Sequence, residues 1–408
     1  MRLLVVADTY FPNKSSVAVL LSDLTSVFLE QGVDVSVLVP ASDQDQDLTF
    51  SEINGCQIIR VRALKTKDVG YFYRAFSEWF NPWIMWIRLR RDGRLMSESF
   101  HGIIWYSPTI FWPPLIKRLK VQFSCKTYLI LRDIFPDWAM HLGLIQQGWR
   151  FSILKRIERS QYSLADYIGV QSPNNLKYFN NNYPQYSTKA QVLWNWARPA
   201  KAALNLVRLP VGLEENFFEK TIFVYVGNLG VSQDPERLLE LAQHLRARND
   251  LGFLVIGRGT FYQQLREHIQ IRDLNNIVIL NEIDPDLLPD LLTRCSIGIL
   301  LLDSRHLTHN IPGKLITYLQ SGLPVLAAIN PGNDLVELIH QYQIGAVYTG
   351  GDAAQLSEIA LDLANTVKND KNISSRARMF VEKQFSALDA VGQVSKSLGL
   401  DLKGTNKS

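Results

Sequence analysis

Residues 309–330 limit the possible fold more than any other stretch of the sequence. The apolar run 297–302 comes just before them and predicts a buried strand. Residues 313–320 carry apolar side chains at helical spacing and stop before a Ser-Gly pair, which predicts a short helix. The apolar residues 323–329 then predict a second strand. A strand, a loop, a helix and a strand in this order are typical of an α/β domain with a doubly wound parallel sheet.

Lys314 lies in the first turn of this predicted helix, directly after Pro312 and Gly313. The backbone N–H groups of a first turn have no helical partners and the helix dipole is positive there, so such an end can bind phosphate. The stretch is not a Walker loop, because Leu315 follows the Gly-Lys pair where that loop has Ser or Thr. A lysine at this place is more often only a solvated charge, so the phosphate prediction depends on the rest of the chain.

Composition and charge exclude several classes of protein. The 408 residues are 47% apolar and 20% charged, which is enough for two or three packed domains. A net charge of +4 is too small to indicate nucleic-acid binding, but it permits an anionic substrate. The three cysteines show no metal spacing and the acidic residues of 43–47 are read as a solvated turn, so we expect no metal and no cofactor. No apolar run approaches the ~18 residues that span a bilayer, so we expect a soluble or peripheral protein. The three cysteines lie far apart in the sequence, from which we expect a reduced, cytoplasmic compartment.

The first half of the chain opens with the same pattern. Residues 3–7 predict a strand, residues 17–28 a helix and residues 33–39 a second strand. Ser15 and Ser16 lie at the start of this helix, where it would face the crevice in which such domains bind their ligands. They are candidates for the acceptor side of a site, although plain N-capping of the helix explains them at least as well.

Residues 71–94 combine aromatic side chains with arginines. Such a combination fits the interfacial zone of a membrane, where the rings insert and the cations meet lipid phosphates. The alternative is a helix pair whose aromatic side chains complete the core. We favour the membrane interpretation because tryptophan is unusually dense here. The residues expected to contact a membrane are Trp79, Trp83, Trp86, Arg88, Arg90 and Arg91.

Asp133 is the second residue after the predicted strand 127–131. An acidic residue at the carboxyl end of a strand lies where ligands bind in doubly wound domains. Asp133 is therefore a candidate for orienting an acceptor hydroxyl or assisting its deprotonation, with helix capping as the alternative. Residues 180–187 are polar and predict a surface loop, and residues 198–220 lack periodicity and predict a linker.

Two predicted strands of the second half, 221–226 and 253–256, each run into a loop that contains glycines. The loop residues that could face a ligand are Gly227, Asn228, Gly230, Gly257 and Arg258. At the carboxyl ends of parallel strands, both loops would lie at the same edge of the sheet as Lys314. The pattern divides the chain into an N-terminal domain, 1–198, a C-terminal domain, 199–385, and a C-terminal helix and tail, 386–408.

Several motifs of the chain resemble those of a known enzyme family. They are TYFPNKSSVAVLLSDL near the start, YVGNLGVSQDPERLLELA in the second half and IPGKLITYLQSGLPVLA near the end. With these motifs the chain resembles the GT-B glycosyltransferases, and among them the retaining enzymes of glycosyltransferase family 4. Two further stretches, RDIFPDWAMHLG and YIGVQSPNNLKYF, are similar to the bacterial O-antigen and capsule enzymes that transfer N-acetyl-L-fucosamine. The resemblance implies an α/β fold of two doubly wound, Rossmann-like domains that face each other across a cleft.

The resemblance also implies which residues bind the nucleotide-sugar. They are Gly227, Asn228, Gly230, Gly257, Pro312 and Gly313. Arg258 and Lys314 would neutralise the negative charge of the leaving nucleotide. The family commonly has two glutamates eight positions apart near this lysine, and His309 and Thr317 stand there instead. Thr317 could still hydrogen-bond a ribose hydroxyl, but the carboxylate is missing.

The reaction that the resemblance implies is the transfer of a sugar from a UDP-sugar to a lipid-linked, undecaprenyl-type saccharide. Transfer would retain the configuration of the sugar, need no metal and take place at the inner-membrane surface, in O-antigen or polysaccharide synthesis. Two other classes of protein remain open, because a fold alone does not determine a function. One is a sugar-nucleotide epimerase with the same architecture, and the other is a non-catalytic, membrane-associated protein that binds nucleotides.

Overall fold

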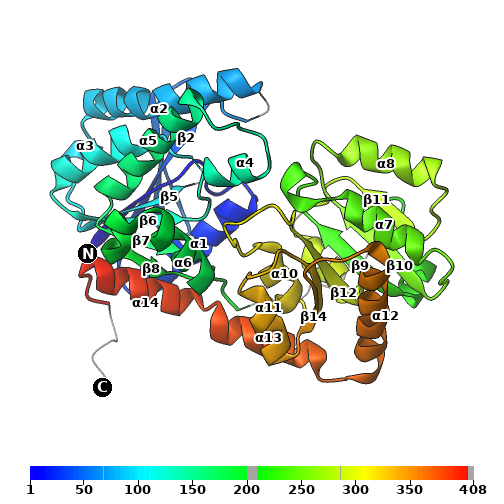
Figure 1. The fold of residues 1–408 in the computed structure, drawn as a ribbon. Helices are drawn as coiled ribbons and strands as arrows, with labels where there is room; N and C mark the ends of the chain where they lie inside the picture. The colour runs from blue at the N-terminus through cyan, green and yellow to red at the C-terminus, as the bar shows by residue number, and fades with distance from the viewer. Residues whose placement is uncertain (68, 108, 200–208, 285, 403–408) are drawn as a thin grey trace. The chain divides into compact units, whose positions relative to one another are not determined.

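The computed structural model describes residues 1–67, 69–107, 109–199, 209–284 and 286–402. Its chain forms two compact units, shown in Figure 1. The first unit contains Met1–Trp196 and Ser386–Ser408, and the second contains Ala197–Phe385. Part of the predicted linker, residues 200–208, and the predicted tail, residues 403–408, lie outside the described residues.

The first unit is built on an eight-stranded sheet in the order β3-β4-β2-β1-β5-β6-β7-β8. All neighbouring strands are parallel except β3 and β4, which form an antiparallel hairpin. The strands are β1 (Arg2–Val6), β2 (Asp34–Ala41), β3 (Leu48–Ile53), β4 (Cys56–Arg62), β5 (Gly102–Ser107), β6 (Lys126–Leu131), β7 (Tyr167–Val170) and β8 (Ala190–Val192). The helices are α1 (Ser16–Glu30), α2 (Tyr71–Asp92), α3 (Pro113–Phe123), α4 (Asp137–His141), α5 (Trp149–Leu164), α6 (Pro173–Asn182) and α14 (Ala387–Leu398).

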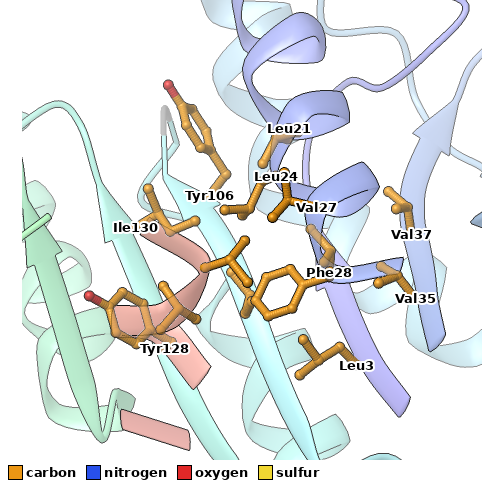
Figure 2. Close-up of a cluster of buried hydrophobic side chains, with 14 of the residues drawn as sticks. Leu3, Leu21, Leu24, Val27, Phe28, Val35, Val37, Tyr106, Tyr128 and Ile130 are labelled. Atoms are coloured by element: carbon orange, nitrogen blue, oxygen red, sulfur yellow. The ribbon is translucent and has the colours of Figure 1, made fainter. Parts of the chain in front are cut away.

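Two apolar cores cover the two faces of this sheet. Leu3 and Val5 of β1 belong to the core under α1 and α14, part of which Figure 2 shows. Leu4 and Val6 belong to the core that includes residues of α2 and α3. Side chains alternate between the faces of a strand, so a strand buried on both faces needs an uninterrupted apolar run. This is why short apolar runs predicted parallel strands such as β1, β9 and β12 correctly.

The second unit is built on a fully parallel sheet in the order β11-β10-β9-β12-β13-β14. Its strands are β9 (Thr221–Val226), β10 (Leu251–Ile256), β11 (Ile277–Leu280), β12 (Ile297–Leu301), β13 (Val325–Ala328) and β14 (Gly345–Tyr348). Its helices are α7 (Glu236–His244), α8 (Tyr262–Ile271), α9 (Leu288–Thr293), α10 (Lys314–Gln320), α11 (Leu335–Tyr342), α12 (Ala353–Asn369) and α13 (Ile373–Gln384). Strand order reverses between β9 and β12, and ligands of doubly wound sheets bind at such a point.

Short 3-10 turns complete the described structure at Leu95–Ser97, Pro184–Lys189, Glu215–Glu219 and Val231–Gln233. The prediction of two doubly wound α/β domains is confirmed. The prediction of a surface loop at 180–187 is wrong, because α6 continues to Asn182 and Tyr183 is fully buried. The Tyr183 hydroxyl lies 2.8 Å from a carboxyl oxygen of Asp137 and 2.8 Å from one of Glu158, and these polar contacts hold the segment against the domain.

Candidate functional site

The loops that follow β9 and β10 in the second unit are joined backbone to backbone. Gly227 N–H donates to Ile256 O over 2.9 Å, and Leu229 N–H donates to Arg258 O over 2.8 Å. A Cβ atom added to Gly257 would lie 1.9 Å from Gly227 O. Gly257 therefore has to be glycine for these two loops to meet. Its predicted contact with a donor remains a prediction, since packing alone explains the residue type.

Lys314 reaches from the start of α10 to the Gly227 loop. Its Nζ atom is shielded from solvent, has no hydrogen-bond partner among the described residues, and lies 3.8 Å from the centre of the Tyr225 ring. A Cβ atom added to Gly227 would lie 3.6 Å from this Nζ atom. Burial lowers the pKa of Lys314 to about 7, because a charged amine loses its hydration there. A cation in this position would be stabilised by an anion at the Gly227 loop.

The turn after β9 is fixed by two tyrosines. The Tyr225 hydroxyl donates to Asn228 O over 2.7 Å, and Val226 N–H donates to the Tyr318 hydroxyl over 2.7 Å. The Asn228 side chain is close to Gly230, where an added Cβ atom would lie 2.6 Å from the amide nitrogen. The sequence analysis did not identify Tyr225 as part of the site. Its position on a buried strand, two residues before a glycine loop, was the only available signal.

The helix that carries Lys314 is shorter than expected. Gly313 is the N-cap residue, so α10 begins at Lys314 itself and Pro312 precedes the helix. Gly313 is exposed and has open space around its Cα atom. Thr317 is half-buried, one turn after the helix start. The structure thus brings Lys314 and Gly227 together. Pro312 and Gly313 are only the two residues that precede Lys314 in the sequence.

Arg258 differs from Lys314 in its surroundings. Its side chain is 71% exposed and forms an ion pair with Glu282 over 2.9 Å. Exposed ion pairs contribute little to stability, so the guanidinium is not firmly held there. The backbone carbonyl of Arg258 accepts a hydrogen bond from Leu229 N–H, but its guanidinium group points to solvent. Its predicted action on the leaving nucleotide remains a prediction.

His309 occupies the first position at which the resembling family has a glutamate. Its backbone is left-handed, with φ 55°, and its Nδ1 atom lies 3.5 Å from the side-chain nitrogen of Asn330. Burial lowers the pKa of His309, while the charge of Asp334 opposes this shift. The ring is therefore neutral at physiological pH and can offer a hydrogen bond, but it cannot replace a negative charge.

The acceptor-side candidates of the first unit lie near the carboxyl edge of its sheet. Asp133 is half-buried and is the second residue after β6. Its neighbour Arg132 is buried and donates to the carbonyl oxygens of Leu193, over 2.8 Å, and Trp194, over 3.3 Å. Burial lowers the pKa of Arg132 to about 10. Arg132 thus ties the segment that carries Asp133 to the end of the first half of the chain, up to Trp194.

Ser15 and Ser16 have distinct places at the start of α1. Ser15 is the N-cap residue, and its hydroxyl accepts a hydrogen bond from Ala18 N–H over 3.4 Å. Ser16 is exposed and is the first residue of the helix. The capping interpretation therefore describes Ser15, and a contact of either serine with an acceptor remains a prediction.

The aromatic stretch is one helix, α2, with Pro82 inside it, and not a helix pair. Opposite its buried side lies a row of apolar side chains that are between 41% and 92% exposed. We call these residues the α2 stripe: Phe72, Phe76, Trp79, Phe80, Trp83 and Ile87. Arg90 and Arg91 are exposed, whereas Trp86 packs on the core and Arg88 forms a 2.9 Å ion pair with Asp47. Among the described residues, no helix is long and apolar enough to cross a membrane.

A buried polar cluster lies under α5 in the first unit. Lys155 Nζ is 2.7 Å from a carboxylate oxygen of Asp137 and 2.7 Å from one of Glu158. Tyr183 joins the same cluster, and burial raises the pKa of Glu158 to about 7. Because Asp137 is the first residue of α4, the cluster holds the start of this helix, which lies four residues after Asp133. Within the described ranges, no group of three His, Cys, Asp or Glu side chains could hold a metal ion.

Comparisons with known proteins agree with this architecture. Residues 214–380 match the family described as Glycosyl transferases group 1. The putative colanic acid biosynthesis glycosyl transferase WcaI of Escherichia coli strain K12 is 26% identical over 215 residues. This alignment covers 50% of this chain and 50% of the relative, so it spans only about half the length of the curated relative.

Solved structures are similar along nearly the whole chain. Sucrose-phosphate synthase from Thermosynechococcus elongatus has a TM-score of 0.70 at 12% identity, with 97% of this chain and 98% of that chain covered. HepE of Anabaena, in complex with UDP and glucose, has a TM-score of 0.65 at 13% identity, with 98% and 99% covered. At these identities the likeness establishes the fold. Residues 214–380 thus form a Glycosyl transferases group 1 domain, in a chain that has the GT-B fold.

Proposed function

We propose that the protein is a retaining, metal-independent glycosyltransferase of family 4. It transfers a sugar, for which N-acetyl-L-fucosamine is the first candidate, from a UDP-sugar to a lipid-linked saccharide in polysaccharide synthesis. The group 1 match supports the reaction class, and the partial likeness to the colanic acid protein supports the polysaccharide setting. HepE, a structural neighbour, was solved with UDP and glucose, which supports a uridine nucleotide as the donor.

The buried Lys314 ammonium is the observation on which the proposal depends. Its Nζ atom lies beside Gly227, over the Tyr225 ring, with no hydrogen-bond acceptor among the described residues. A nucleoside diphosphate that binds at the Gly227 loop would supply this acceptor. An anion in a site shielded from water interacts strongly with a fixed cation, because little solvent screens the charges.

The proposed mechanism uses this cation in the step that breaks the sugar–phosphate bond. Negative charge builds up on the diphosphate as the bond breaks, and Lys314 stabilises it together with Arg258. Arg258 would have to exchange Glu282 for the phosphate, which its exposed ion pair permits. The leaving phosphate then accepts the proton of the attacking hydroxyl on the same face of the sugar, so configuration is retained. Asp133 orients the hydroxyl from the acceptor side.

Replacing Lys314 tests the leaving-group function. Lys314→Ala should lower turnover by roughly 10²–10³-fold, the effect of removing one preorganised group that stabilises developing charge. Arg258→Ala should lower turnover too. Arg246→Ala is the matched control, since Arg246 is exposed in the same unit and should leave turnover unchanged. The measurement is the release of UDP from a UDP-sugar in the presence of a lipid-linked acceptor. Near-normal rates in Lys314→Ala and in Arg258→Ala would refute their function in stabilising the leaving group.

A thermal-shift comparison of UDP, GDP, ADP and CMP separates this proposal from the other two classes. A ligand present at ~100 times its dissociation constant adds about 2.7 kcal/mol of stability, which is measurable in a melting curve. Stabilisation by UDP, and by none of the other three nucleotides, would support a UDP-sugar as the donor. Conversion of a UDP-sugar without any acceptor would instead identify an epimerase, and nucleotide binding without sugar release would identify a non-catalytic protein.

A further inference from the structure

Asp8 is the second residue after β1, which ends at Val6. β1 and β5 are parallel neighbours, and β5 and β6 are parallel neighbours. The carboxyl ends of all three strands therefore meet at one edge of the first unit's sheet, which is the edge where doubly wound domains bind ligands. Asp8 thus lies at the same edge as Asp133, which follows β6.

The Oδ1 atom of Asp8 is shielded from solvent and has no hydrogen-bond partner among the described residues. Burial raises the pKa of Asp8, and the charge of Lys67 acts in the opposite direction. The nearby charged groups of α2 have partners of their own. Arg74 donates to Glu78 over 2.7 Å, and the other Glu78 oxygen accepts from Thr109 over 2.7 Å. Asp8 is therefore left with a buried oxygen that no described side chain satisfies.

Tyr106 lies on β5, between the strands that lead to Asp8 and Asp133. It is the second-last residue of β5 and is 6% exposed. Burial raises the pKa of its hydroxyl, the charge of Arg132 opposes this shift, and the charges of Asp133 and Asp8 add to it. Asp8 and Asp133 follow the two strands that flank β5. A polar group that enters between them would meet the free oxygen of Asp8.

We infer that Asp8 belongs to the acceptor subsite and hydrogen-bonds a hydroxyl group of the acceptor saccharide. This inference depends on the proposed function, since it names a ligand of the same reaction. A buried carboxyl oxygen without a partner destabilises a fold, so Asp8 does not serve stability. A sugar hydroxyl is a suitable partner, because it can donate to the carboxylate or accept from the carboxylic acid. Asp8 would contact the acceptor, and Asp133 would orient the attacking hydroxyl beside it.

The stability of Asp8→Asn in the full chain provides the first test. Because the Oδ1 atom of Asp8 has no hydrogen-bond partner among the described residues, the variant should melt at the same temperature as the unchanged protein or higher. Asp43→Asn is the matched control, since Asp43 is an exposed residue of the same unit. A fall of several degrees in Asp8→Asn, with no change in Asp43→Asn, would make Asp8 a structural residue and overturn the inference, whether or not an acceptor has been found.

Kinetics with octyl glycosides of glucose, galactose and N-acetylglucosamine as acceptor probes provide the second test. Asp8→Ala should raise the acceptor KM by roughly 10–100-fold, as expected for one hydrogen bond to a charged group, with the donor KM unchanged and an intermediate value for Asp8→Asn. A deoxy form of the best probe that lacks the hydroxyl bound by Asp8 should have a higher KM than the best probe itself with the unchanged protein. With Asp8→Ala, the two probes should have the same KM. An unchanged acceptor KM, or equal losses in both proteins for every deoxy probe, would overturn the inference.

The same probes distinguish failure of the inference from failure of the proposed function. If the protein transfers sugar to none of them, binding of the probes is measured directly by saturation-transfer NMR, while UDP release with a lipid-linked acceptor decides the transferase proposal. Binding by the unchanged protein and by Asp43→Asn, but not by Asp8→Ala, would support a saccharide site at Asp8. Absence of binding to the unchanged protein would overturn the inference.

Discussion

Lys314 illustrates what a single residue reveals before and after its surroundings are known. The sequence shows that a lysine opens a helix after a strand, which is a common arrangement for a solvated charge. The structure adds that its amine is buried over Tyr225, which lies 89 residues earlier in the chain. No local pattern reports this contact, because it depends on which strands become neighbours. The burial of Lys314 could therefore not be predicted, although its location could.

The pKa of Lys314 leads to a prediction about stability. Its pKa is about 7 in the folded chain, compared with an ordinary value of 10.5. Between these values the unfolded chain binds more protons, so the free energy of unfolding rises with pH across this interval. Lys314→Met removes this dependence. We expect the variant to be more stable than the unchanged protein near pH 7, with an advantage that shrinks as the pH rises toward 10.

Urea unfolding at pH 7, 8 and 9 measures this difference. Lys371→Met is a suitable control, because Lys371 is exposed. If the difference in the free energy of unfolding between Lys314→Met and the unchanged protein stays constant over this pH range, Lys314 does not titrate there.

At the scale of secondary-structure elements, the more deeply a strand is buried, the more readily it could be predicted from the sequence. Strands such as β1, β9 and β12 were predicted because strands covered on both faces need apolar residues at every position. The parallel strands β8 and β14 were not predicted, and most of their residues are only half-buried. The hairpin of β3 and β4 was missed, since it lies at the sheet edge and its side chains are mixed. Its turn carries Asn54 and Gly55, both with positive φ, and an Asn-Gly pair is a strong hairpin signal that the sequence analysis did not use.

The α2 stripe leads to a prediction about membranes. Trp79 and Trp83 are 46% and 41% exposed, so replacing both with Ser should weaken binding to anionic liposomes without a large loss of stability. Trp86 is not a useful target, because it packs on the core. Ile271→Ser is the matched control, since Ile271 is 79% exposed on the second unit. Sedimentation with vesicles that contain phosphatidylglycerol measures binding, and unchanged partitioning of the double variant would argue against the stripe.

At the scale of the whole molecule, the division of the chain is the main result that local patterns did not give. Residues 386–408 stood apart in the sequence analysis as a helix and tail, but α14 belongs to the first unit and packs against α1. Helical spacing showed that α14 exists. It could not show which unit the helix covers, because both sheets need apolar helices on their faces.

Replacing Val394 tests this assignment. Val394 is fully buried on α14, so Val394→Asp places an unpaired charge in the first unit's core and should unfold that unit at a lower temperature. Stabilisation of the second unit by UDP should persist, since the candidate donor residues all lie there. Lys396→Ala, at an exposed position of the same helix, should melt normally. Calorimetry with and without UDP distinguishes these outcomes, and equal loss of both transitions would contradict the assignment.

The return of the chain to the first unit also determines the order in which the protein can be completed during synthesis. Residues 1–196 leave the ribosome first, but the core between β1, α1 and α14 stays open until the last helix emerges. The second unit, made of one continuous segment, has its full sequence available earlier. Domains commonly finish folding from the N-terminus onward. Here the first unit can be completed only after the second unit has been made, so its apolar sheet face must stay protected from aggregation until α14 emerges.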